Sequence, residues 1–196
     1  ATLTNDKARQ EAIFTKTTQL FPNDFRAYNN LGEMAFAAGD MAKAESFFKQ
    51  AAAKNANAPE VNANLGLVEL VKNNVAAAET FLGKATGANA ANEALGNLYI
   101  KQGQYQRAVS AFGNAKTNSA AQAQILAKDY NKAKNTLNAV ANPDAYTSYL
   151  KAIVGARTNN ESLVKNSIKA AIAKDASLAT KAANDREFAK FASALK

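Results

Sequence analysis

The sequence predicts an all-α protein built from repeated pairs of helices. Three observations lead to this prediction: no segment alternates apolar and polar residues as a strand would, apolar residues recur at helical spacing, and one pattern of large and small residues repeats along the chain. The 196 residues are 47% hydrophobic and 20% charged, which is the composition of a folded protein rather than a disordered one.

The repeating pattern is clearest between residues 25 and 113. A Leu-Gly pair occurs three times, and an alanine, a large apolar residue and a second alanine follow its glycine after 12, 16 and 19 residues. The first two copies are 34 residues apart, and the third begins 30 residues after the second. The members are Leu31, Gly32, Ala44, Phe48 and Ala51; Leu65, Gly66, Ala78, Leu82 and Ala85; and Leu95, Gly96, Tyr99, Ala108, Phe112 and Ala115.

Each copy predicts one helix-turn-helix repeat. The glycine allows two helices to approach closely, the alanines admit the facing helix, and the large residue fills the space between repeats. The turns are predicted at Gly39-Asp40, Asn73-Asn74 and Gly103-Gln104, because these residue types tolerate a left-handed backbone and cap helices. The repeats therefore span 25–58, 59–88 and 89–113.

This pattern resembles the tetratricopeptide repeat, a helix-turn-helix unit with Leu-Gly in its first helix and Ala, an aromatic residue and Ala in its second. The resemblance implies a right-handed α-α superhelix whose first helices line a concave groove. It also implies a non-enzymatic scaffold that binds a peptide or a protein segment in that groove.

The flanking segments predict a degraded continuation of the same array over 1–196, as a single solenoid. Residues 5–22 read as the second helix of a partial repeat after a turn at Asn5-Asp6, so the chain starts in mid-repeat, as if cut from a longer array. Degenerate repeats are predicted over 114–142, with a turn at Asp129-Tyr130, and over 143–178, with a turn at Asn159-Asn160. A capping helix over 179–196 carries Phe188, Phe191 and Leu195.

The composition excludes most catalytic and metal chemistry. With 0 Cys and 0 His, the chain cannot form thiol or histidine triads, disulfides or ordinary zinc sites, so we expect no enzyme, metal or cofactor. The only catalytic device left is a pair of carboxylates such as Glu33 and Glu60, which are more simply explained as surface charges. The apolar runs are too short for a transmembrane helix.

Candidate ligand-binding residues are those on the first helices that the packing pattern does not use. They are Arg26, Asn29, Asn30, Glu33, Asn64, Leu67, Glu93, Asn97 and Lys101. Asn30, Asn64 and Asn97 are the strongest candidates, because an amide can both donate to and accept from a peptide backbone. The alternative is that they are polar residues on a hydrated surface. A chaperone-tail clamp is not predicted, since only Asn64 occupies a position that such clamps use.

Charge is concentrated in the second half of the chain. Residues 1–97 carry a net charge of −1 and residues 98–196 a net charge of +9. A basic face is predicted at Lys128, Lys132, Lys134, Lys165 and Lys169. It would attract an acidic partner, although a solvated surface is the simpler explanation. The few arginines and the lack of a continuous basic stripe argue against a nucleic acid as the partner.

Two functions remain open on the sequence. The first is a protein-protein interaction scaffold that binds a peptide or protein segment in its groove. The second is an architectural spacer or accessory module of a larger bacterial envelope complex, with an acidic partner on the basic half. The Asn, Ala and Lys usage is typical of bacteria, and the second alternative favours a periplasmic or outer-membrane-associated location over the cytoplasm.

Overall fold

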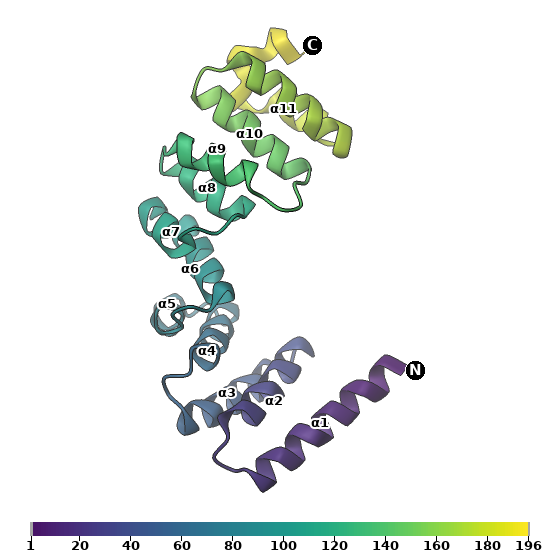
Figure 1. The fold of residues 1–196 in the computed structure, drawn as a ribbon, viewed down its shortest axis with the longest axis vertical. Helices are drawn as coiled ribbons and strands as arrows, with labels where there is room; N and C mark the ends of the chain where they lie inside the picture. The colour runs from purple at the N-terminus through teal and green to yellow at the C-terminus, as the bar shows by residue number, and fades with distance from the viewer. Residues whose placement is uncertain (1, 196) are drawn as a thin grey trace. The chain divides into compact units, whose positions relative to one another are not determined.

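The computed structural model describes the backbone of residues 2–195 and the side chains of residues 6–192 (Figure 1). Every regular element in this range is helical, which confirms the predicted all-α class. The elements are α1 (Thr2–Leu20), α2 (Phe25–Ala37), α3 (Met41–Lys54), α4 (Pro59–Val71), α5 (Val75–Lys84), α6 (Asn89–Lys101), α7 (Tyr105–Phe112), α8 (Asn118–Leu126), α9 (Tyr130–Asn138), α10 (Ala145–Arg157), α11 (Glu161–Lys174), α12 (Leu178–Asn184) and the 3-10 segment η1 (Arg186–Leu195).

The chain divides into two compact units, an N-terminal unit of residues 1–95 and a C-terminal unit of residues 96–196. Each unit has its own apolar core. One core of the N-terminal unit joins Phe48 of α3 to Val61 and Leu65 of α4, and one core of the C-terminal unit joins Tyr149 of α10 to Ile168 of α11. A single solenoid over residues 1–196 stays a prediction.

One internal register relates all five helix pairs from α2–α3 to α10–α11. In the degenerate repeats, alanine replaces the glycine, and the buried residues still follow it after 12 and 16 positions. The register residues of these two repeats are Ala121, Ala133 and Leu137, and Ala152, Val164 and Ile168. All six are at most 4% exposed. The sequence pattern therefore weakens in the fourth and fifth pairs while the packing register persists.

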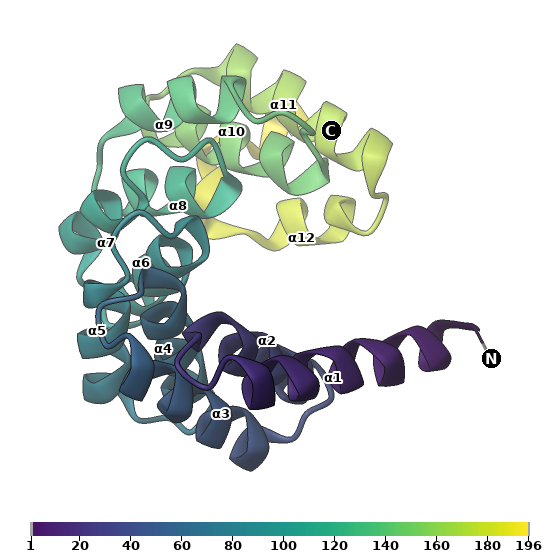
Figure 2. The same ribbon diagram turned by 60° about the horizontal axis from the view of Figure 1, so that its bottom comes forward.

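The same turn closes all five pairs, whose helices are labelled in Figure 2. Seven residues after the small residue, the chain adopts a left-handed backbone, and the next amide N–H donates to the carbonyl oxygen five residues before it at 2.8–3.0 Å. The left-handed residues are Gly39, Asn73, Gly103, Lys128 and Asn159. The turn predicted at Asp129-Tyr130 thus lies one residue earlier: Lys128 takes the left-handed position, and Asp129 caps α9 by accepting from the Lys132 amide at 3.1 Å. The sequence did not predict the left-handed backbone at Lys128, because lysine rarely adopts this conformation.

Replacing Lys128 with glycine is expected to stabilise the protein. Lys128 has φ +64°, a conformation that costs a residue with a Cβ about 1 kcal/mol relative to glycine. Lys134→Gly changes charge equally but lies inside α9, so it should lower the free energy of unfolding by about 1 kcal/mol. Urea unfolding of both variants checks this, and a loss of stability in Lys128→Gly would contradict the turn assignment.

The three glycines of the clear repeats lie directly against the large residue of their own second helix. A Cβ on Gly32 would lie 2.5 Å from Phe48 Cδ1, and a Cβ on Gly66 would lie 2.6 Å from Leu82 Cγ. A Cβ on Gly96 would lie 2.5 Å from Phe112 Cε2. These large side chains therefore pack within their own helix pair as well as toward the next repeat, as the core shared by Phe48 and α4 shows.

The two ends of the chain differ from the sequence expectation. No turn forms at Asn5-Asp6, because both residues lie inside α1. Asn and Asp are only modestly poor helix formers, so they do not end a helix without a residue that prefers a left-handed backbone. At the other end, α12 stops at Asn184 and η1 follows, so two short segments replace one capping helix.

The C-terminal segment is held by Asp185 and Phe188. The Tyr149 hydroxyl donates to Asp185 Oδ2 at 2.6 Å, and the Tyr149 and Phe188 rings meet edge to face with centroids 5.5 Å apart. Arg157 Nε donates to Glu187 Oε2 at 2.7 Å, which adds an ion pair between α10 and η1. As expected of a cap, Phe188 and Phe191 are buried against α10 and α11.

These contacts predict a loss of stability at alkaline pH. Burial first, and then the hydrogen bond to Asp185, raise the pKa of Tyr149 above that of a free phenol. The fold therefore favours the neutral phenol, so this contribution is complete below about pH 10 and is lost as the pH rises toward the folded-state pKa. The free energy of unfolding measured from pH 9 to 11 should fall less steeply in Tyr149→Phe than in the parent chain. Equal slopes would contradict the assignment.

Candidate functional site

Three of the predicted site residues form a hydrogen-bonded cluster between α2 and α4, which we call the α2–α4 polar cluster. Asn64 Nδ2 of α4 donates to Asn29 Oδ1 and to Glu33 Oε1 of α2, both at 3.0 Å. Asn29 Nδ2 donates to the same Glu33 oxygen at 2.8 Å. The cluster therefore links two first helices that are neighbours in the N-terminal unit.

The local sequence explains why these side chains meet. Asn29 and Glu33 are four residues apart, so they lie on the same side of α2. Asn64 follows the buried Ala63 and precedes the buried Leu65, which fix the rotation of α4 and direct Asn64 toward α2. Asn29 is only 4% exposed, and an amide buried to this extent needs partners. Within the cluster, Asn64 donates to the oxygen of the Asn29 amide, and Glu33 accepts from its NH2 group.

The cluster keeps acceptor groups for a ligand. Among the described residues, no donor is bound to Glu33 Oε2 or to Asn64 Oδ1. Glu33 is exposed and Asn64 is partly exposed. Two oxygens held in place by internal hydrogen bonds suit a ligand that offers N–H donors, such as a peptide backbone or a cationic group.

The other predicted residues of the N-terminal unit are not part of the cluster. Arg26 is exposed, and its Nη2 donates to Asp24 Oδ2 at 2.7 Å, which lowers the pKa of Asp24. Asn30 and Leu67 are partly exposed, and Glu93 is exposed on the first turns of α6. Phe36, also on α2, is partly buried and packs against the core around Phe48.

The remaining candidates lie in the C-terminal unit. Asn97 is partly exposed and Lys101 is exposed on the last turns of α6. The five lysines of the predicted basic face come from the α8–α9 turn, α9 and α11, and all except the partly exposed Lys132 are exposed. In the described chain, α9 and α11 each pack against α10 and not against one another. Lys165 and Lys169 share one side of α11.

No group of His, Cys, Asp and Glu side chains that could hold a metal ion is found among the described residues. Glu33 is engaged by two asparagines, while Glu60 lies exposed on the first turn of α4. The expectation that Glu33 and Glu60 carry no catalysis stays a prediction.

Sequence reasoning missed a second polar network in the N-terminal unit. Lys72 Nζ lies 3.1 Å from both Glu45 Oε1 of α3 and Glu69 Oε1 of α4, and Asn74 Nδ2 donates to Glu69 Oε2 at 2.7 Å. Glu69 is 7% exposed, and it occupies the register position where α2 has Ala35. The sequence could have indicated this network, because Glu69 is acidic at a register position that is apolar in the preceding repeat. The network ties α3 to the α4–α5 turn.

Comparison with known proteins agrees with the geometry. Three family models, each described as a tetratricopeptide repeat, match residues 7–60, 35–99 and 91–122. The chain belongs to the tetratricopeptide repeat family. Proteins of this family are generally non-enzymatic scaffolds that bind protein or peptide partners, and the chain is an interaction module of that type.

Solved structures share the fold at low sequence identity. YrrB, described as a TPR protein with an unusual peptide-binding site, is 20% identical with a TM-score of 0.65, over 83% of this chain and 92% of that one. PilW, a type IV pilus biogenesis factor, is 18% identical with a TM-score of 0.64, over 100% and 93%. PilF of Pseudomonas aeruginosa is 13% identical with a TM-score of 0.71, over 97% and 91%. No curated protein matches the sequence significantly.

Proposed function

We propose that the chain is a scaffold that binds a peptide or protein segment across α2 and α4, with the α2–α4 polar cluster as its anchor. The observation that carries the proposal is the pair of hydrogen bonds from Asn64 to Asn29 and Glu33, because they fix acceptor oxygens on two adjacent repeats. Anchoring groups that are already fixed lose little entropy when a ligand binds.

The ligand is a segment that presents N–H donors to Glu33 Oε2 and Asn64 Oδ1. An extended backbone offers such donors at every second residue on one side, so it can reach both repeats. Leu67, one turn after Asn64 and partly exposed, offers an apolar contact beside them. Asn30, also on α2 and partly exposed, would extend the same site within the N-terminal unit.

Binding to a selected peptide tests the proposal. Peptides are first selected from a random display library on the intact chain, and their Kd is then measured by calorimetry. Glu33→Gln keeps the side-chain shape and the oxygen that accepts from both asparagines. It removes the charge and places an NH2 donor where Oε2 faces the ligand, so it should raise Kd about tenfold for a donor-rich ligand. Asn64→Ala should raise it at least as much. Asn135→Ala, an exposed change on α9, is the matched control.

Circular dichroism establishes that each variant is folded. If Glu33→Gln and Asn64→Ala are folded and bind the selected peptide as the parent chain does, the α2–α4 polar cluster is not the binding site. Selection of no peptide by the intact chain would also count against the proposal.

A second candidate function is favoured by the charge of residues 98–196, which is +9. In this proposal the chain is an accessory module of a bacterial envelope complex, periplasmic or outer-membrane associated, and Lys165 and Lys169 contact an acidic partner. The structural similarity to PilW, a type IV pilus biogenesis factor, supports a search in that compartment. Among the described helices, none has the length and apolar character that a bilayer crossing needs.

Salt dependence distinguishes the second candidate from the first. Crosslinking of the intact chain in a bacterial envelope fraction should capture an acidic partner whose yield falls steeply with ionic strength. Lys165→Glu with Lys169→Glu should abolish the capture, whereas Lys49→Glu with Lys54→Glu, exposed on α3, should not. Capture that is insensitive to salt and to both pairs of changes would exclude the basic face.

A further inference from the structure

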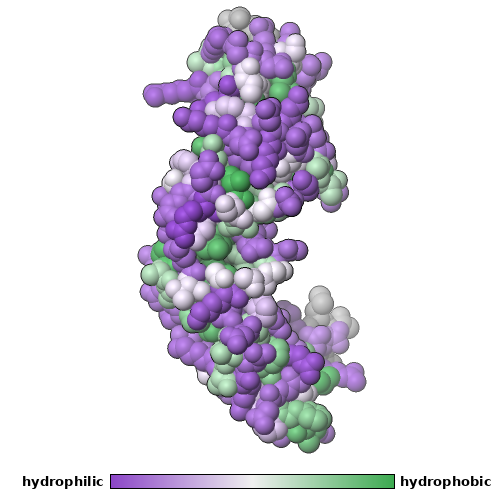
Figure 3. Space-filling model, turned by 60° about the vertical axis from the view of Figure 1, so that its left-hand side comes forward, coloured by the Kyte–Doolittle hydropathy of each residue, from purple (hydrophilic) through white to green (hydrophobic). Residues whose placement is uncertain are grey.

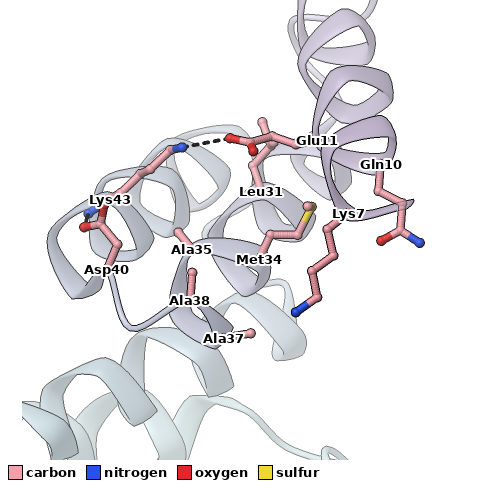
Figure 4. Close-up of a pocket in the computed structure, with 10 residues that line it drawn as sticks. All are labelled: Lys7, Gln10, Glu11, Leu31, Met34, Ala35, Ala37, Ala38, Asp40 and Lys43. Carbon is pink, nitrogen blue, oxygen red and sulfur yellow. Dashed lines mark hydrogen bonds and ion pairs between the residues drawn. The ribbon is translucent and has the colours of Figure 1, made fainter. Parts of the chain in front are cut away.

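A pocket of about 260 Å³ lies in the N-terminal unit, between α1 and the C-terminal half of α2, with the start of α3 at its edge (Figure 4). Its base is formed by the apolar side chains of α2 and its rim by charged residues. The lining residues that matter here are Leu31, Met34 and Ala38 at the base, and Lys7, Glu11 and Lys43 at the rim.

The repeat register shows how the residues of α1 at this pocket differ from those of α3. Counting back 34 residues from Ala44 and Phe48 leads to Gln10 and Phe14 on α1. Ala44 is fully buried between helices, whereas Gln10 is exposed and lines the pocket. A long polar residue thus stands at the edge of the pocket, at a register position where α3 has a small buried one.

The pocket is separate from the α2–α4 polar cluster. At 3.6 residues per turn, Asn29 and Glu33 lie on one side of α2, and Met34 and Ala38 lie on the opposite side. A ligand in the pocket and a ligand on the cluster would therefore contact different faces of the same helix.

Among the described residues, one cation of the rim, Lys7, has no acidic partner. Lys43 Nζ donates to Glu11 Oε1 at 2.8 Å, which neutralises both groups and ties α1 to α3 (Figure 4). Asp40 caps α3 by accepting from the Lys43 amide at 3.0 Å, where the helix dipole offsets its charge. Lys7 extends past Met34 in Figure 4 and has no acidic partner among the described residues. The rim thus favours a negative group beside Lys7.

We propose that the pocket is a second binding site, which takes a large aliphatic side chain of an acidic segment of a partner protein. The aliphatic group occupies the space over Leu31, Met34 and Ala38, and a carboxylate one or two residues away pairs with Lys7. Met34 is unbranched and adapts its shape to the guest. A peptide is the occupant because the volume suits one side chain and the open rim leaves room for a backbone to continue.

Methionine methyl signals report occupancy directly. The chain has two methionines, Met34 in the pocket and Met41, which does not line it and serves as the internal reference. In the protein labelled with ¹³C-methyl methionine, the capped peptide Glu-Leu-Glu-Leu-Glu should shift the Met34 signal and leave that of Met41 in place. The matched peptides Glu-Ala-Glu-Ala-Glu and Lys-Leu-Lys-Leu-Lys should have little effect, because one lacks the aliphatic group and the other the carboxylate.

Two pairs of variants locate the contact. Lys7→Glu should raise the Kd of the acidic peptide about fivefold, the scale of one exposed ion pair, and Lys16→Glu on the opposite side of α1 should not change it. Ala38→Leu fills the pocket and should abolish the Met34 shift, whereas Ala53→Leu, exposed on α3, should preserve it. None of these changes touches the α2–α4 polar cluster, so the outcome is independent of the first site.

The proposal is overturned by an unmoved Met34 signal in the parent chain. It is also overturned if the alanine or lysine peptide shifts Met34 as strongly as the acidic leucine peptide. A further probe is decanoate, which carries a carboxylate and an aliphatic chain without a backbone. If decanoate shifts Met34 and the peptide does not, the site takes a fatty acid, and the protein-segment assignment is wrong.

Discussion

Phe48→Ala is expected to lower the free energy of unfolding of the chain by about 4 kcal/mol, because it empties the centre of the core between α3 and α4. Phe48 is 1% exposed and is surrounded by Ala35, Val61 and Leu65. Its ring also covers Gly32, which has no side chain with which to fill the space. Chemical denaturation monitored by circular dichroism measures the loss.

Phe47 provides the matched control for this change. It is the adjacent residue on the same helix, it is only partly buried, and its ring lies near the ammonium group of Lys43. Phe47→Ala should therefore cost about 1 kcal/mol, the loss of a partly buried apolar surface. Similar losses for Phe47 and Phe48 would show that the helix is rotated relative to the arrangement described above.

The same substitution, glycine to alanine, should have opposite effects at two positions of the α4–α5 pair. At Gly66 a Cβ would lie 2.6 Å from Leu82 Cγ and 3.2 Å from the Leu82 backbone nitrogen, so the helices must separate. We expect a loss of about 2 kcal/mol. At Gly83 a Cβ meets nothing within 4 Å, and alanine should stabilise α5 by about 0.5 kcal/mol.

Thermal unfolding of the two variants and the parent chain measures both the loss and the gain of stability. Gly66→Ala should melt below the parent chain and Gly83→Ala slightly above it. A stabilising effect at Gly66 would mean that the close approach of α4 and α5 is not required, and it would remove the reason given for the Leu-Gly pairs.

Much of the fold could be predicted because a few residue types at fixed spacing determine how the helices pack. Gly32, Phe48 and their equivalents specify which faces of two helices meet, and a fixed spacing is visible without a structure. The repeat pattern is harder to recognise where alanine replaces glycine, as at Ala121 and Ala152, because alanine is common throughout the sequence. Lys128 could not be predicted as a turn residue for a related reason: its conformation is imposed by the packed helices on either side rather than by its own preference.

The candidate site was less accessible to sequence reasoning. Repeat spacing placed Asn29, Glu33 and Asn64 on first helices, but hydrogen bonds between them depend on the rotation of α2 against α4, which sequence spacing does not fix. The pocket was not predicted at all. Gln10 lines it at the register position where α3 has Ala44, and this difference is visible only when the register is extended backwards along α1.

The constant register of the helix pairs has a consequence for how the chain folds. Helix contacts in the described chain join elements that lie close together in sequence, with α2–α3 and α10–α11 as extensive examples. Little loop-closure entropy opposes such contacts, so the transition state forms from local structure and folding is fast. Hydrogen exchange should therefore report graded protection, highest within the buried helix pairs and lowest in α1, whose helix packing in the described chain is with α2.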